Sequence, residues 1–205
     1  MKHLKMLGLA TVAVTILIAF AARDTASAAV SLCSTTTTPC TSEVPTGTTF
    51  DFSLKSGTTL KMVTTDGKTT LKTCTSSTIK GALTSATPPT GPISELTWGG
   101  CNHQTKTTML GKLQIDAIAG TDNGTVTADE VIEFTTDTVL FGSCSYGAIT
   151  GTDLGTLVAG SPATFIVNAV VKKTVGSESA CPETAQWTAE YVLTAPAGTT
   201  IDIEP

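Results

Sequence analysis

The chain has little positive charge and few aromatic residues. Charged residues make up 14% and aromatic residues 5% of its 205 residues, and Arg23 is the one arginine. Recognition of nucleic acid needs clustered lysine and arginine to neutralise phosphates, so the sequence argues against a nucleic-acid partner. Anionic lipid is disfavoured for the same reason. No Gly-rich phosphate loop or other cofactor motif is present, and we expect no cofactor.

Long apolar runs are absent after the N-terminus, where one run covers residues 6–22. Lys2 and Lys5 precede it, and Ala26-Ser27-Ala28 follows as a small-x-small cleavage pattern. The run approaches the roughly 17-residue lower limit of a spanning helix, so a membrane anchor is the competing interpretation. The basic flank and the cleavable exit favour a signal peptide over residues 1–28, with cleavage after Ala28. We therefore expect a secreted or cell-surface protein without an integral membrane segment after cleavage.

Beyond residue 28 the chain is acidic. The 12 basic residues lose Lys2, Lys5 and Arg23 and become 9, while the 17 acidic residues lose Asp24 and become 16, which gives a formal charge of −7. Such a charge says nothing specific about a partner. A cell-envelope polymer or a surface protein is the kind of partner that an exported chain would meet.

All six cysteines lie in the exported part, and an even number in an exported chain predicts three disulfides. We prefer sequential pairing among the 15 possible connectivities, because each pair would then close its own β unit. The two longer loops would each contribute about 3–4 kcal/mol. The expected pairs are Cys33–Cys40, Cys74–Cys101 and Cys144–Cys181. Zinc is disfavoured because no Cys-x-x-Cys pair exists and His103 is the only histidine after the signal.

Apolar residues recur with period two through most of the chain, which predicts an all-β fold. Threonine, at about one residue in five, also suits a pleated surface. The pattern predicts ten to eleven short strands in a disulfide-pinned antiparallel β-sandwich or barrel. We expect a Thr/Pro-rich N-terminal arm over residues 29–48, which would be a solvated linker or carry O-glycans, and one β domain over residues 49–205.

Turn signals divide the predicted strands. Asp66-Gly67 and Asn123-Gly124 predict two-residue hairpin turns, the second leading into a strand over residues 126–134. Residues 87–92, which contain three prolines, predict a loop because proline cannot donate to a ladder. Residues 102–108 are polar and are expected to form a turn.

Five motifs resemble sequences in a group of small exported bacterial proteins. These are TCTSSTIKG (73–81), LTWGGC (96–101), GKLQI (111–115), CSYG with GTL (144–157) and CPETAQWTAEY (181–191). That group has the same order of cysteine pairs and a similar A-x-W-x-A-x-Y strand, and the resemblance runs from about residue 73 to the C-terminus. The layout is also similar, more weakly, to exported proteins named as activators of alkane oxidation. The resemblance implies the fold and export, and it implies no catalytic residues.

Candidate catalytic residues are sparse. His103 is the only available base for a serine or cysteine nucleophile, and it lies in a polar loop. Two carboxylates across a cleft could hydrolyse a glycoside, although charges on the outer face of a sheet explain the same residues. The acidic candidates are Asp116, Asp129, Glu130, Glu133, Asp137 and Asp153. The sequence forces no two of them together, so we assign no catalytic residue.

The sequence offers two candidate binding sites, one for calcium and one built from aromatic residues. Residues 121–124 with Asp129 and Glu130 offer oxygen ligands for calcium, but they depart from the calcium-loop pattern, and ordinary turn chemistry explains them. We therefore expect no metal site. Aromatic residues could line a sugar- or lipid-binding face, although packing beside disulfides is more usual. We expect Trp98 and Trp187 in the core and Tyr146, rather than Tyr191, at the surface.

The sequence does not state a specific function. It favours a non-enzymatic binding or structural module at the cell surface, with specificity in its loops. The alternatives are an exported hydrolase that uses paired carboxylates on a carbohydrate-type substrate, and a binder of apolar small molecules. A hydrolase would show a cleft with two carboxyls roughly 5–10 Å apart. A lipid or alkane binder would show an apolar cavity of about 300 Å³ or more.

Overall fold

A computed structural model describes residues 30–35 and 39–204 of the chain. The predicted signal peptide and its cleavage site at Ala28 lie outside the described residues. Within them the protein contains sixteen β-strands and no helix, so the all-β prediction is confirmed, while the expected ten to eleven strands were too few. The strands are β1 (Ser31–Cys33), β2 (Thr49–Leu54), β3 (Leu60–Thr64), β4 (Thr70–Cys74), β5 (Ser76–Ala82), β6 (Ser85–Ala86), β7 (Pro89–Gly99), β8 (Thr105–Met109), β9 (Lys112–Ala117), β10 (Gly124–Ala128), β11 (Ile132–Thr138), β12 (Gly142–Ala148), β13 (Asp153–Val158), β14 (Thr164–Lys173), β15 (Thr184–Ala195) and β16 (Asp202–Glu204).

Eight strands close into an antiparallel barrel. The order around it is β2-β5-β7-β9-β10-β13-β14-β15, and β15 pairs again with β2. Closure leaves no exposed edge along this ring, which is how small all-β proteins avoid edge-to-edge association. Of the two architectures that the sequence left open, the barrel therefore describes this half of the molecule.

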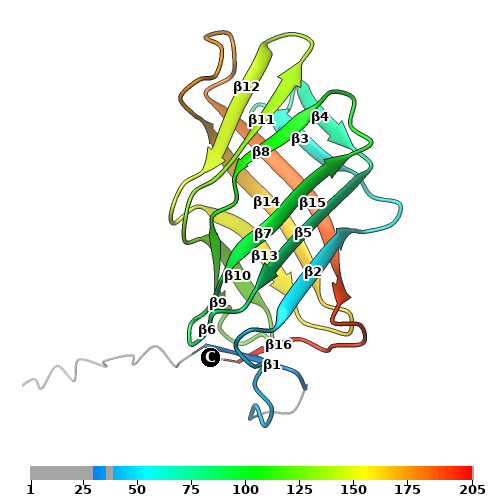
Figure 1. Ribbon diagram of the computed structural model, residues 1–205, viewed down its shortest axis with the longest axis vertical. Helices are drawn as coiled ribbons and strands as arrows, with labels where there is room; N and C mark the ends of the chain where they lie inside the picture. The colour runs from blue at the N-terminus through cyan, green and yellow to red at the C-terminus, as the bar shows by residue number, and fades with distance from the viewer. Residues whose placement is uncertain (1–29, 36–38, 205) are drawn as a thin grey trace, which may run out of the picture.

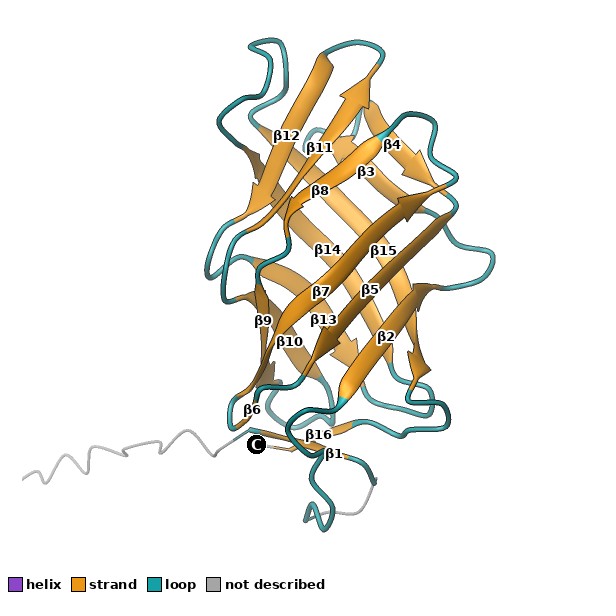
Figure 2. Ribbon diagram, viewed as in Figure 1, coloured by secondary structure: helices purple, strands orange, loops and turns teal. Residues whose placement is uncertain are grey.

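The long strands β14 and β15 extend beyond the barrel and support a second, stacked compartment (Figures 1 and 2). Along one edge, β15 pairs with β2 in the barrel and with β3 above it. Along the other, β14 pairs with β13 in the barrel and with β12 above it. The hairpin of β3 and β4 and the ladder of β12, β11 and β8 complete the upper walls.

β4 and β8 are the two end strands of the large sheet, and no backbone ladder joins them. We call the gap between them the seam, and residues 99–104 and buried side chains fill it. Asn102 exchanges two hydrogen bonds with the backbone of Thr73, and the Cys74–Cys101 disulfide lies beside them. The side chain of Lys72 is fully buried and its Nζ donates to the carbonyl oxygens of His103 and Gln104. The predicted turn over residues 102–108 is shorter than expected, because β8 begins at Thr105 and pairs with β11.

The two chain ends close the opposite end of the barrel. β1 pairs with β16, so that Leu32 lies opposite Ile203, and both side chains are buried. Val44 is also buried, and its amide donates to the carbonyl oxygen of Leu32. Leu32 and Val44, which lie in the expected arm, are therefore part of the folded core. We call the β1–β16 sheet the lid.

Several expected boundaries were wrong for local reasons. The predicted strand over residues 126–134 is divided into β10 and β11, because the amides of Asp129 and Glu130 both donate to the carbonyl oxygen of Lys112 and bend the chain. The predicted proline loop is short, and β7 begins at Pro89. The turn after β9 covers residues 118–123, whereas Gly124 is already in β10.

The upper core is built around three aromatic side chains. The ring centroids of Trp98 and Phe134 lie 4.8 Å apart, and those of Phe134 and Trp187 lie 5.7 Å apart. Trp187 is buried as expected, while Trp98 is half-buried and its indole N–H donates to the hydroxyl of Thr107. The expectation of a surface Tyr146 was wrong, because its side chain is completely buried in β12.

Candidate functional site

Most of the acidic residues considered for catalysis have a local partner, and Asp129 and Glu130 both lie near Lys112. Glu130 forms an ion pair with Lys112, and the amide of Gly155 donates to Asp153 over 2.8 Å. The side-chain amide of Gln114 donates to both carboxylate oxygens of Asp116. The hydroxyl of Thr108 donates to Glu133 over 3.3 Å. Asp137 lies near Lys72 and Asp129 is half-buried after β10. Of the three hollows described in this protein, one contains Glu130 and none contains two of the six.

His103 and the calcium candidates have structural roles. His103 is half-buried, and its carbonyl oxygen accepts a hydrogen bond from Lys72 at the seam. In the turn after β9, the hydroxyl of Thr121 donates to the carbonyl oxygen of Ile118, and the side-chain oxygen of Asn123 accepts from the amide of Ala159. Among the described residues, no group of three or more His, Cys, Asp or Glu side chains could hold a metal ion.

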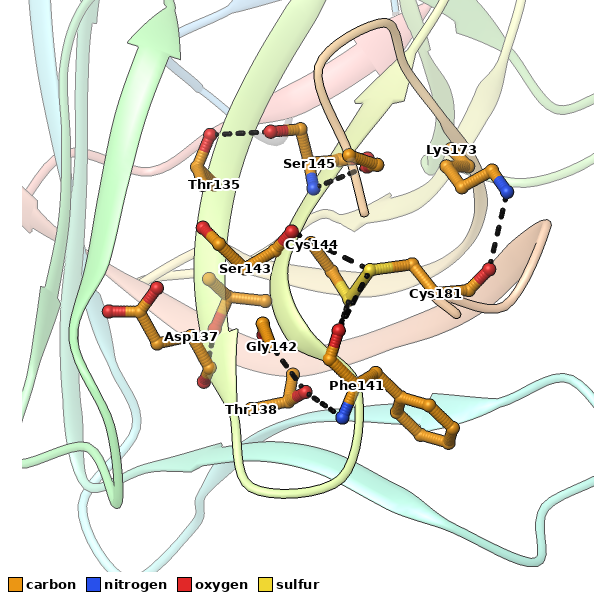
Figure 3. The surroundings of a disulfide bond; sticks show 12 residues. Thr135, Asp137, Thr138, Phe141, Gly142, Ser143, Cys144, Ser145, Lys173 and Cys181 are labelled. Carbon is orange, nitrogen blue, oxygen red and sulfur yellow. Dashed lines mark hydrogen bonds between the residues drawn. A yellow bond between two sulfur atoms is a disulfide. The ribbon is translucent and has the colours of Figure 1, made fainter. Parts of the chain in front are cut away.

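The end of the molecule away from the lid presents three loops that the β3–β4, β11–β12 and β14–β15 connections form. The Cys144–Cys181 disulfide joins the third of these loops to β12, the strand that follows the second (Figure 3). All three disulfides follow the sequential pairing. The carbonyl oxygen of Phe141 lies 3.6 Å from Sγ of Cys181, so the β11–β12 loop rests on the disulfide. Thr138 stabilises that loop by accepting from the amide of Phe141 and donating to the carbonyl oxygen of Gly142.

Further hydrogen bonds attach the long β14–β15 loop to β12. The amide of Ser145 donates to the hydroxyl of Ser177, which in turn donates to the carbonyl oxygen of Ser145, both over 2.7 Å. The amide of Glu178 donates to the carbonyl oxygen of Ser143. At the start of the loop, Nζ of Lys173 donates to the carbonyl oxygen of Cys181 and forms an ion pair with Glu183. The loop is therefore held in one position relative to the sheet.

An open groove of about 450 Å³ lies between the β3–β4 hairpin and these joined loops. We call it the loop-end groove. Its lining residues are Thr64, Thr65, Asp66, Thr69, Phe141, Pro182, Glu183 and Thr184. The two sides touch at one point, where the hydroxyls of Thr65 and Thr184 lie 3.1 Å apart. The lining therefore combines hydroxyls and carboxylates with the rings of Phe141 and Pro182, and it includes no basic side chain.

Asp66 is held in its ionised form. The hydroxyl of Thr64 donates to its Oδ1 over 2.5 Å, and the amide of Lys68 donates to the same atom. These two hydrogen bonds, the Thr64 bond first, lower the pKa of the Asp66 carboxyl. The groove therefore presents a charged acceptor at neutral pH.

Apolar side chains form the rim beside the groove. Val139 and Leu140, which precede Phe141, are 78% and 70% exposed, and Val175 in the neighbouring loop is fully exposed. We call these three the apolar rim. Exposed apolar side chains gathered at one end of a molecule are a common feature of interaction surfaces.

Sequence reasoning missed this groove. The aromatic residues considered for a binding face were Trp98, Trp187, Tyr146 and Tyr191, and the fold places three of them in the core. Two signals were present, namely the Asp66-Gly67 turn and the exposed run of Val139, Leu140 and Phe141. They lie more than 70 residues apart in the sequence, and only the fold brings their loops together.

Comparisons with models of known protein families, with curated proteins and with solved structures find no match to this chain. Over residues 30–35 and 39–204, the structure contains no helix that is long and apolar enough to cross a membrane. The three disulfides agree with an extracellular location, where an oxidising environment preserves such bonds.

Proposed function

We propose that the protein is a non-enzymatic binding module outside the cytoplasm and that its loop-end groove recognises a neutral polysaccharide of the cell envelope. The observation that carries this proposal is the composition of the groove. A sugar ring has an apolar face of C–H groups and a rim of hydroxyls. Phe141 and Pro182 offer flat apolar surfaces to the first, while Asp66, Glu183 and the threonine hydroxyls offer hydrogen bonds to the second.

Charge selects among polymers. Asp66 lies 4.0 Å from Nζ of Lys68 and Glu183 forms an ion pair with Lys173, so the groove carries little net charge and suits a neutral polymer. The loops that carry these residues are fixed by the Cys144–Cys181 disulfide and the Ser145–Ser177 hydrogen bonds. Fixed loops lose little conformational entropy when a ligand binds, which favours binding by a shallow groove.

The first experiment separates the culture medium, a salt wash of intact cells and the membrane fraction of the native host. Recovery in the wash fits a surface-bound module. Purified protein is then sedimented with insoluble envelope polysaccharide. Phe141→Ala and Asp66→Asn should each weaken binding by about tenfold or more, the size expected for an anchoring residue.

Two matched variants make the result specific. Leu140→Ala removes a neighbouring exposed apolar side chain, and Asp122→Asn removes an exposed turn carboxylate at the lid end, and neither should change binding. Unchanged affinity for Phe141→Ala and Asp66→Asn would refute the groove as the site. Loss of binding in Leu140→Ala alone would instead place the polysaccharide on the apolar rim.

A further inference from the structure

An apolar cavity of about 90 Å³, partly open to solvent, lies at the end of the barrel where the lid packs. Phe52, Ile79, Leu113 and Leu157 contribute to it from the barrel wall, and Leu32 and Ile201 contribute from the lid and the residues before β16. It is separate from the loop-end groove and shares no lining residue with it. Its behaviour can therefore be tested independently of the proposed function.

Two glycines line the cavity where β5 and β7 approach closely. A Cβ on Gly91 in β7 would lie 1.9 Å from the carbonyl oxygen of Ala82 in β5, and a Cβ on Gly81 would lie 2.8 Å from the carbonyl oxygen of Pro92. Neither position accepts a side chain without a backbone shift, so this part of the wall is built from backbone.

The side chains around the cavity are incompletely packed. Phe52 and Leu113 pack against the buried hydrophobic cluster and remain half-buried, whereas Phe134 and Trp187 in the upper compartment are buried. Protein interiors normally have a packing density of about 0.75, with few voids larger than a water molecule. An eight-stranded barrel is wide enough either to be filled by side chains or to hold one small ligand.

The lining defines the chemistry of a ligand. Almost all of the surface facing the cavity is carbon. A buried water needs two to four polar partners, which this wall does not offer. Dry cavities of about 150 Å³ in other proteins bind benzene or xenon. The barrel cavity is smaller, so benzene is the largest of these ligands that it should hold. The volume of the barrel cavity is well below the roughly 300 Å³ expected for a lipid or alkane binder.

We propose that the barrel cavity is a binding site for one small apolar molecule, between xenon and benzene in size and without hydrogen-bonding groups. The probes are xenon gas under pressure and benzene near its aqueous saturation. In methyl NMR spectra of the purified protein, the resonances of Ile79, Leu113 and Leu157 should shift, and those of Leu140 should not. Benzene should raise the Tm by about 2 °C, because it binds the folded state alone.

Filling the cavity supplies the matched control. Leu113→Phe should at least halve the rise in Tm, whereas Leu140→Phe, the same change on the exposed rim, should leave the rise intact. If Leu113→Phe does not fold, the methyl spectrum of the unaltered protein decides the question. The proposal is overturned if the cavity methyls stay unmoved at saturation, or if the shifts appear only at the apolar rim.

Discussion

Replacing Lys72 with methionine tests whether a charged side chain is as deeply buried at the seam as the structure shows. The Lys72 side chain has no exposed surface, and its nearest partners are two backbone carbonyl oxygens rather than a carboxylate at ion-pair distance. Burial away from water lowers the pKa of its ammonium from 10.5 to about 8, and the more distant Asp137 opposes part of that shift.

The shift fixes how the stability depends on pH. The unfolded chain keeps the Lys72 proton up to pH 10.5, whereas the folded chain releases it near pH 8. Because the unfolded state binds more protons in that window, the free energy of unfolding rises with pH. One group with these two pKa values should add about 2 kcal/mol between pH 8 and pH 10. The Lys72→Met variant should lack this rise.

The assay is urea unfolding followed by tryptophan fluorescence, with the disulfides intact, at several values from pH 8 to pH 10. Trp98 and Trp187 pack together in the core and should report global unfolding. Burial raises the pKa of Tyr146 to about 12 and raises that of Tyr191 as well, so both tyrosines lower the unfolding free energy as the pH approaches 10, equally in wild type and variant. The quantity of interest is the difference between the wild-type and variant unfolding free energies.

Lys61→Met is the matched control, because Lys61 lies exposed on the neighbouring strand β3, opposite Thr73. Its difference from wild type should stay constant with pH. If the Lys72→Met difference is also constant to within about 0.5 kcal/mol, Lys72 titrates as a solvated lysine. The Lys72 side chain would then not be buried at the seam.

Two further predictions concern buried polar groups. Desolvation, and after it repulsion from Asp122 and Glu204, raises the pKa of the Asp202 carboxyl in the lid. The folded state therefore favours the neutral carboxyl, and the contribution of Asp202 to stability should rise as the pH falls towards 3.8. Asp202→Asn should abolish that rise in acid urea titrations and be no less stable at pH 7, and a clear loss at pH 7 would contradict this account. Tyr191→Phe should cost about 1–2 kcal/mol, because its hydroxyl lies 2.9 Å from that of Ser77 inside the core. Tyr146→Phe should be neutral or stabilising, because the buried Tyr146 hydroxyl has no partner among the described residues; equal costs for the two variants in urea unfolding would contradict the hydrogen-bond assignment.

The alternation of apolar residues predicted much of the fold correctly. In β15 every second side chain is buried, as the alternation of Trp187, Ala189 and Tyr191 predicts. The residues of β14 are apolar on both faces and predict burial on both, but Ile166 and Val170 are exposed. The Asp66-Gly67 signal lies in the tip of the β3–β4 hairpin, where the backbone of Gly67 has a positive φ of 71°. A two-residue period is a local property of the chain, and local properties can be read from sequence.

Short strands and the lid escaped prediction for a physical reason. β1 and β16 have three residues each, too few to show a period, and they lie 170 residues apart. Gly124 illustrates the consequence. The sequence predicts it in a turn, but it lies in β10, where a Cβ would lie 2.6 Å from Cγ2 of Ile115 in β9 and 3.0 Å from Cδ1 of Ile203 in the lid. The glycine therefore leaves room for side chains of a neighbouring strand and of the lid.

The sequence by itself determined that this chain forms β-strands, and it indicated three disulfides in sequential order, because alternation and cysteine count are written directly in the residues. Only the tertiary structure decided that the strands close into a barrel with a second compartment, that Lys72 and Tyr146 are buried, and that three distant loops form one groove. The reason is that a period of two assigns each side chain to a face of its strand but does not say which strand lies beside it. Partner choice depends on contacts between residues far apart in the chain, and those contacts create the candidate sites.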